Sequence, residues 1–146
     1  MTLAIRPAEP RDRRRCIELL CLLGGPGGRA EPPGAAETFD ALLGQARGAI
    51  LVASEGEAVL GMATQSYNLA LRYGGEYAQL EELIVDPAAR GRNLGAMLVE
   101  AAIAAARARG AKEYGLYLLP WTEKNQPFYE KFGLERVGSE MRMRLP

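Results

Sequence analysis

The stretch from Leu80 to Leu98 constrains the fold more than any other part of this chain. It opens with a short apolar run, Leu83-Ile84-Val85, which Asp86-Pro87 closes. Because proline has no amide donor and ends a strand's hydrogen-bond ladder, the run predicts a buried strand, although a buried helix would have the same apolar content. The loop Arg90–Gly95 follows, and its two glycines and Asn93 are residue types that tolerate a positive backbone φ.

A helix is expected directly after this loop. Its apolar residues recur at helical spacing, at Leu94, Met97, Leu98, Ala101, Ala105 and Ala108. Arginines in the last turn and Gly110 are typical of a helix end. The free N–H groups and the positive dipole end at its start would form an anion site beside Arg90 and Arg92. The alternative is a plain strand–loop–helix connection with a solvated basic loop. The sequence contains neither G-x-G-x-x-G nor a glycine loop followed by Lys-Ser/Thr.

This segment resembles the acyl-CoA-binding motif of the GNAT superfamily of N-acyltransferases, Q/R-x-x-G-x-G/A. Arg90 matches the first position, Gly95 matches the last, and Asn93 stands where the middle glycine is usual. Leu80–Val85 resembles the family's L-E-D-L-x-V strand. The resemblance implies acetyl-CoA as co-substrate, with the pantetheine arm paired to the backbone of Leu83, Ile84 and Val85. It implies that the pyrophosphate is held by Arg90, Gly91, Arg92, Asn93, Leu94, Gly95 and Ala96.

A second signature lies near the C-terminus. Residues 126–134, QPFYEKFGL, resemble the family's F-Y-E-K-x-G-F helix. The resemblance implies that Tyr129 is the general acid toward the departing CoA thiolate, and a packed aromatic with a surface hydroxyl is the alternative. The asparagine that the family usually carries seven residues earlier is Thr122 here. Asn125, nearby but out of register, is retained as a candidate CoA contact.

Acetyl transfer to an amine needs a proton acceptor, because alkyl amines are largely protonated at neutral pH. The chain has no histidine, so the candidates are a carboxylate, a tyrosine or ordered water. Glu81 and Glu82 are the best placed. As neighbours in a strand they are expected on opposite faces unless a β-bulge intervenes, so that one reaches the site. Burial would raise its pKa. The alternative is that both are structural charges. The family resemblance suggests a main-chain N–H near Val85 as oxyanion donor.

The acceptor amine is the least defined part of the prediction. The resemblance implies an acceptor site built by Gly24–Phe39 and Tyr67–Tyr77. Within the second segment, the candidates for a polar pocket are Tyr67, Asn68, Arg72 and Tyr73; a solvated Arg72 is the alternative to one that pairs with an acidic acceptor. We expect an N-acetyltransferase that acts on a small-molecule amine, a peptide N-terminus or a lysine by direct attack in a ternary complex. A non-catalytic acyl-CoA-binding module is the alternative, and a plain nucleotide-binding domain is a weaker third.

Length and composition favour one domain over residues 1–146. The net charge of zero gives no reason to expect a nucleic-acid partner. Without a membrane-length apolar run or a signal peptide, the protein is expected in the cytoplasm with no membrane partner. Without histidine or C-x-x-C, no metal is expected. Cys16 and Cys21 would diverge on one helix, which disfavours a disulfide. Because the family often dimerises through its C-terminal strands, a homodimer is the expected assembly.

The remaining elements alternate between helices and strands. Helices are expected from the N-cap Asp12 to Leu23, with Arg13–Arg15 solvated, and over residues 35–45. Residues 24–34 read as a loop. The expected strands cover residues 3–6, 49–54, 58–68, 77–85, 113–119 and 135–145. This order predicts a mixed α/β fold. The resemblance implies a twisted, mostly antiparallel sheet that splays between strands four and five, with about four flanking helices.

Overall fold

The computed structural model describes residues 2–24 and 27–146; Met1 and two residues of the expected 24–34 loop, Gly25 and Pro26, lie outside them. The described chain forms a sheet in the order β1-β2-β3-β4-β5. Neighbouring strands are antiparallel, except that β4 and β5 are parallel. The strands are β1 (Leu3–Pro7), β2 (Gly48–Glu55), β3 (Ala58–Ala70), β4 (Gly75–Val85) and β5 (Tyr114–Gly115). The predicted mixed sheet is therefore confirmed.

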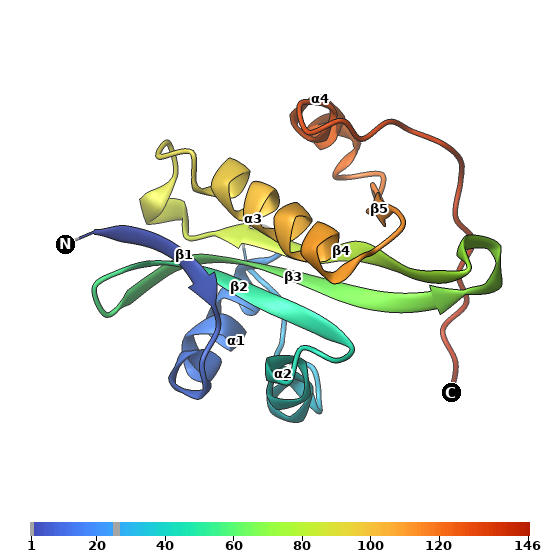
Figure 1. Ribbon diagram of the computed structural model, residues 1–146. Coiled ribbons are helices and arrows are strands. Elements are labelled where there is room, and N and C mark those ends of the chain that lie inside the picture. Colours follow the sequence, from blue (N-terminus) through green and yellow to red (C-terminus); the bar gives the residue numbers. More distant parts are fainter. Residues whose placement is uncertain (1, 25–26) are drawn as a thin grey trace.

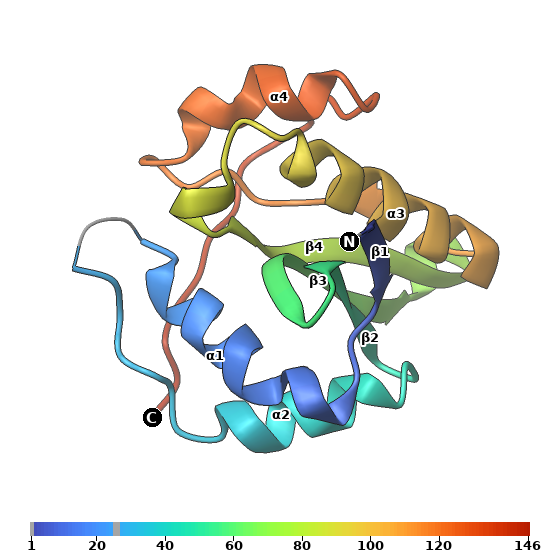
Figure 2. The same ribbon diagram turned by 90° about the vertical axis from the view of Figure 1, so that its left-hand side faces the viewer.

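Helices cover both faces of the sheet, as Figures 1 and 2 show. On one face lie α1 (Arg13–Leu22) and α2 (Ala35–Leu43). On the other lie α3 (Leu94–Arg109) and α4 (Gln126–Glu130). The long α3 carries the chain from β4 to the parallel β5, because a parallel pair cannot be joined by a tight hairpin.

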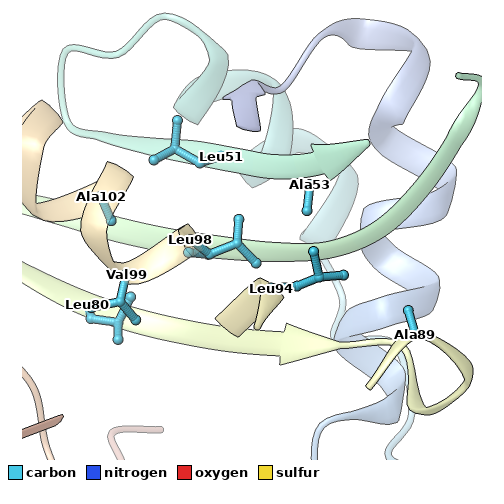
Figure 3. Packing of buried hydrophobic residues seen from close by; sticks show 9 residues of the cluster. Leu51, Ala53, Leu80, Ala89, Leu94, Leu98, Val99 and Ala102 are labelled. Carbon is cyan, nitrogen blue, oxygen red and sulfur yellow. The ribbon is translucent and has the colours of Figure 1, made fainter. Parts of the chain in front are cut away.

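Each face of the sheet has its own apolar core. The core under α3 joins Leu94, Leu98 and Val99 of the helix to Leu51 and Leu80 of the sheet (Figure 3). The core under α1 and α2 is formed by Cys16, Leu19, Phe39, Ile50, Val52, Val59, Met62 and Ile84. Burial on both faces explains why residues 83–85 are apolar without alternation.

The start of α1 differs from the expectation. Asp12 precedes the helix but does not cap it with its side chain. Instead its carboxylate accepts hydrogen bonds from the Arg6 guanidinium at 2.7 and 3.1 Å and from the Glu9 N–H at 2.8 Å. Arg15, expected in solvent, donates to the Val59 carbonyl at 3.0 Å and pairs with Asp86. Asp12 thus pairs with Arg6 of β1 and does not cap the helix, and Arg15 binds β3 and Asp86 and does not point into solvent. These contacts connect the start of α1 to β1, β3 and the end of β4.

The C-terminal part is the main correction to the predicted fold. The expected strand 113–119 is reduced to Tyr114–Gly115, and the described residues 135–146 contain no strand at all. After α4 the chain continues to the C-terminus as a coil outside the sheet (Figure 1). Alternating side chains favour a strand only where another strand completes its hydrogen bonds, and this segment has no such neighbour within the described chain.

Two smaller expectations have clear outcomes in the structure. Cys16 and Cys21 are free thiols in the described chain, so no disulfide links them. Among residues 2–24 and 27–146, no helix has the length and apolar character needed to cross a membrane.

Candidate active site

Strand β4 is paired with β5 along only part of its length. Their pairing consists of Ala78 with Tyr114 and Gln79 with Gly115, whereas β4 continues to Val85. Beyond Gln79 the two segments therefore diverge, which is the splay that the family resemblance implied. The peptide groups along the free edge of Leu80–Val85 are available to an extended ligand, in the way an exposed sheet edge accepts an added strand.

A pocket of about 170 Å³ lies where β4 ends and α3 begins. Its wall is the loop after β4, in which Gly91 (φ 83°) and Asn93 (φ 63°) both adopt the left-handed conformation. Within the described chain, the Asn93 side chain makes no capping hydrogen bond to α3. The first N–H groups of α3 are thus left for another acceptor, and the positive end of the helix dipole favours an anion there.

Most of the predicted cofactor residues line this pocket, which we call the cradle. They are Val85, Arg90, Gly91, Asn93, Leu94, Gly95 and Ala96. Leu83 and Ile84 instead supply the strand edge. Arg92 points elsewhere and pairs with Glu55 at 2.7 Å, and Asn125 is exposed at the start of α4. The Thr122 hydroxyl accepts the Leu119 N–H at 2.8 Å.

Phe128 also lines the cradle, and it was not among the predicted site residues. It lies on α4, which is distant from β4 in the sequence, so the contact between Phe128 and the cradle arises only from the tertiary structure. The only hint in the sequence that Phe128 belongs to the site was its position within the signature of residues 126–134. Tyr129, its neighbour, packs edge-on against it with the ring centroids 5.0 Å apart. Burial raises the pKa of the Tyr129 hydroxyl, which keeps it protonated and able to donate.

Both acidic candidates lie on β4, at a β-bulge. Thr64 is opposite Glu82 and Gln65 is opposite Leu80, so Glu81 is the extra residue of the bulged strand. The Thr64 hydroxyl donates to Glu82 at 2.5 Å, and the Ser66 hydroxyl donates to Glu81 at 2.6 Å. Since residues two apart in a strand share a face, both carboxylates lie on the face that Thr64 and Ser66 share. The sequence predicted opposite faces unless a bulge intervened, and the bulge is present here.

Glu82 is the more enclosed of the two carboxylates. Burial is the main cause that raises the pKa of its carboxyl above the usual value, and the negative charge of Glu81 raises it further. The Thr64 hydrogen bond opposes this shift. The same Thr64 hydroxyl accepts the Glu82 main-chain N–H at 3.1 Å, so one side chain orients both the backbone and the carboxylate. Glu81 is exposed, and its hydroxyl partner Ser66 is in turn held by Asn68 at 2.9 Å.

Glu82 lies in the wall of a second pocket, of about 270 Å³, on the α1 and α2 face of the sheet. We call it the acceptor pocket. Its other walls include Arg29 of the α1–α2 connection, Thr38 and Phe39 of α2, and Met62 and Thr64 of β3. The end of β4 therefore contributes to both pockets, Val85 to the cradle and Glu82 to the acceptor pocket. Two ligands that enter from opposite faces would meet at this strand.

The predicted substrate residues do not form one pocket. Tyr67 accepts a hydrogen bond from Gln65 at 3.1 Å and lies under the Arg109 guanidinium, 4.1 Å from its ring centroid. Arg72 is exposed at the β3–β4 turn, where it stacks on Tyr73. None of the four predicted residues lines the acceptor pocket in the described structure. The other predicted segment, Gly24–Phe39, supplies much of its wall.

A metal centre finds no support in the described residues, where no three His, Cys, Asp or Glu side chains gather as ligands. The groups that the site offers are a partly buried carboxylate, a protonated phenol and free main-chain amides. Such groups can exchange a proton with an amine, donate a proton to a leaving group and bind a phosphate.

Comparison with known proteins agrees with this geometry. A model of the acetyltransferase (GNAT) family matches residues 17–134. A glucosamine 6-phosphate N-acetyltransferase of Trypanosoma brucei brucei is 34% identical over 74 residues, which are 51% of this chain and 48% of the relative. The chain thus matches about half the length of this curated relative.

Solved structures resemble the whole chain. A transcriptional regulator from Bacillus halodurans C-125 has a TM-score of 0.85 and 27% identity, with 99% of this chain and 100% of that chain covered. An aminoglycoside N-acetyltransferase in complex with CoA has a TM-score of 0.81 and 20% identity, over 99% and 95% of the two chains. At that identity the second likeness concerns the fold alone.

Proposed function

Because this chain belongs to the acetyltransferase (GNAT) family and is an acetyl-CoA-dependent acetyltransferase, we propose that it acetylates a primary amine of a small molecule by direct attack in a ternary complex. The observation that carries this proposal is the Glu82 carboxyl, which is enclosed in the acceptor pocket on the strand that also borders the cradle. A base in that position reaches an amine on one side while the acetyl donor lies on the other.

The cofactor side of the proposal follows from the free β4 edge and the start of α3. The pantetheine arm pairs with the backbone of Leu83–Val85, where the pairing with β5 has ended. The pyrophosphate binds the first N–H groups of α3, with Arg90 as a cation at the mouth. Arg92 serves instead as an ion-pair partner of Glu55.

Each protein group then has one role. Acetyl-CoA supplies the activated acetyl thioester. Glu82 accepts a proton from the incoming ammonium group, so that a neutral nitrogen can attack. A main-chain N–H near Val85 donates a hydrogen bond to the developing oxyanion. Tyr129, whose phenol is protonated at neutral pH, donates its proton to the departing thiolate.

The test compares Glu82→Gln with Glu81→Gln. Glutamine keeps the shape of the side chain but cannot accept the proton, so Glu82→Gln should lower kcat/KM by about 10²–10⁴-fold. It should also remove the acidic limb of the pH–rate profile, which in the wild type reports the raised pKa of Glu82. Glu81→Gln, the matched control, should change the rate only a few-fold and keep that limb.

Other outcomes of this comparison are informative. If Glu81→Gln alone loses the limb, then Glu81 is the base. If both variants keep the wild-type profile, the proton passes to water. Calorimetric titration with acetyl-CoA should give the same affinity for both variants, which separates loss of chemistry from loss of binding.

We further propose that residues 1–146 act as one catalytic domain and that two copies associate through the C-terminal segment. Val137, Met141, Met143 and Leu145 are between 75 and 97% exposed, which is unusual for a row of apolar side chains with no partner. The intact acidic pair and Tyr129 favour an enzyme over the alternative of a non-catalytic binding module.

A further inference from the structure

The residues that line the acceptor pocket indicate which kind of amine it can bind. The inference drawn from them rests on the proposed function. Its inner wall is formed by Phe39 (4% exposed), Met62 (3%) and Ile50 (5%), with Leu20 and Leu42 beside them. These side chains come from α1, α2, β2 and β3, so the apolar wall is built by tertiary packing. Glu82 and Thr64 form the polar part of the wall, where β3 and β4 pair.

We propose that the acceptor is a small primary amine with an apolar substituent, which binds with its nitrogen at Glu82 and its hydrocarbon part against the apolar wall. The volume of about 270 Å³ lies just below the range of roughly 300–1,000 Å³ typical of small-molecule sites. Burial of hydrocarbon there is favourable because apolar surface is removed from water.

The polar groups in the pocket are too few for a polyhydroxylated acceptor. The Thr64 hydroxyl is already engaged twice, as donor to the Glu82 carboxylate and as acceptor from the Glu82 N–H. Burial is the main cause that raises the pKa of the Cys16 thiol to about 12, so Cys16 contributes a neutral, weakly polar group. Thr38 and Arg29 remain for a ligand. Each sugar hydroxyl buried without a partner would weaken binding.

The charges at the pocket also favour a simple ammonium ion. Glu82 lies in its wall and Glu81 lies beside it on the same face of the sheet, whereas Arg29 is the single cationic residue among the described lining residues. A cationic head group is attracted to this end of the pocket. A phosphate dianion would meet the Glu82 carboxylate in the pocket wall, with Glu81 close outside it, so the sugar phosphate named in the trypanosomal relative is not the acceptor we infer.

The first experiment measures kcat/KM by thiol release for n-alkylamines of increasing length, 2-phenylethylamine, ethanolamine and glucosamine 6-phosphate. Each added methylene should raise kcat/KM by about fourfold until the pocket is filled, since a buried methylene contributes about 0.8 kcal/mol. Ethanolamine should fall below propylamine, and glucosamine 6-phosphate should be the poorest. A flat alkylamine series, or glucosamine 6-phosphate as the best acceptor, would overturn the inference.

A pair of variants in α2 locates the effect. Ala35 lines the pocket, whereas Ala41 is exposed and outside its lining, and both substitutions place phenylalanine in the same helix. Ala35→Phe should lower kcat/KM for 2-phenylethylamine at least 10-fold more than it lowers kcat/KM for ethylamine. Ala41→Phe should leave both unchanged. Equal losses for the two amines in Ala35→Phe would contradict the assignment of the pocket.

Failure of the inference can be told apart from failure of the proposed function. If the protein binds acetyl-CoA in calorimetry but releases thiol with none of the amines, both fall. If thiol is released with polar amines and the alkylamine series is flat, the acetyltransferase function stands and only the apolar acceptor is wrong.

Discussion

At the scale of single residues, Thr64 decides how Glu82 behaves. Its hydroxyl holds the Glu82 carboxylate and N–H together, at 2.5 and 3.1 Å, and Thr64 is itself only 5% exposed. Burial raises the pKa of the carboxyl and the Thr64 hydrogen bond lowers it. A base that must take a proton near neutral pH depends on the balance of these two effects.

Thr64→Val tests that balance. Valine has nearly the same shape but no hydroxyl, so the carboxylate loses the hydrogen bond that favours its charged form. The pKa of Glu82 should rise, and the acidic limb of the kcat/KM profile should move to higher pH. Ser66→Ala, which removes the donor to Glu81 instead, is the matched control and should leave the limb in place. A limb unmoved by Thr64→Val would show that it does not report Glu82.

Tyr129→Phe tests the acid. The ring keeps its edge-on packing with Phe128, so the fold and the cradle should be preserved. Loss of the proton donor should lower kcat by about 10²-fold or more and leave the affinity for acetyl-CoA within a few-fold. Phe132→Leu, a change in the same aromatic cluster, serves as the packing control. Parallel losses of turnover and affinity in Tyr129→Phe would assign the tyrosine to packing.

At the scale of elements, two local irregularities place the chemistry. The bulge at Glu81 brings two adjacent carboxylates onto one face of β4. The left-handed residues Gly91 and Asn93 turn the chain so that α3 starts beside the end of the same strand. The bulge thus sets which carboxylates share the face of the acceptor pocket, and the left-handed loop sets where the anion site at the start of α3 lies.

Gly95 offers a test of the cradle that separates binding from stability. A Cβ at this position would contact the Phe128 ring at 3.7 Å, an ordinary distance, and its φ does not require glycine. Gly95→Ala should therefore stabilise the protein by up to about 1 kcal/mol. It should nevertheless weaken CoA binding, if phosphate oxygens approach the main chain there.

Gly95→Asp extends this test. Aspartate in the first turn of α3 complements the helix dipole, so the free protein should remain folded with little loss of stability. CoA binding should be abolished by the negative charge at the pyrophosphate position. Thermal unfolding measures the stability and calorimetry the affinity. Unchanged CoA affinity in both variants would mean that the cradle does not hold the cofactor.

At the scale of the whole molecule, the C-terminal segment is notable for the apolar side chains that it leaves exposed. Residues 135–146 leave α4 and follow an extended path, and Arg142 lies over Tyr117 at 4.9 Å (Figure 1). Its apolar side chains alternate as in a strand and face outward. The strand that the sequence predicts over 135–145 would form if a second copy supplied the missing edge.

Removal of residues 135–146 tests this arrangement. The full-length protein should be a dimer in light scattering coupled to size exclusion, and the chain that ends at Leu134 should be a monomer. Met141→Ser with Met143→Ser should weaken the dimer, whereas Arg144→Ser, a change of a neighbouring polar residue, should not. A monomeric full-length protein at tens of micromolar would refute the proposed assembly.

The sequence by itself determined the local features of this protein. Apolar runs, glycines and helical spacing are short-range signals. The strand expected over residues 77–85, the cradle loop and α3 could therefore be predicted from residues 77–110, and β4 begins only two residues earlier, at Gly75. Most of the predicted cofactor residues line one pocket for the same reason: they are contiguous in the chain.

Only the tertiary structure decided the rest, because the features concerned depend on residues distant in the chain. The bulge arises from the register of β3 against β4, and Phe128 reaches the cradle from α4. The acceptor pocket joins α1, α2 and three strands. Of the two acceptor segments that the family resemblance implied, Gly24–Phe39 contributes lining residues, whereas Tyr67, Asn68, Arg72 and Tyr73 do not. The segment 135–145 has the alternation of a strand, yet a strand requires a partner edge, and no pattern within the segment can specify one.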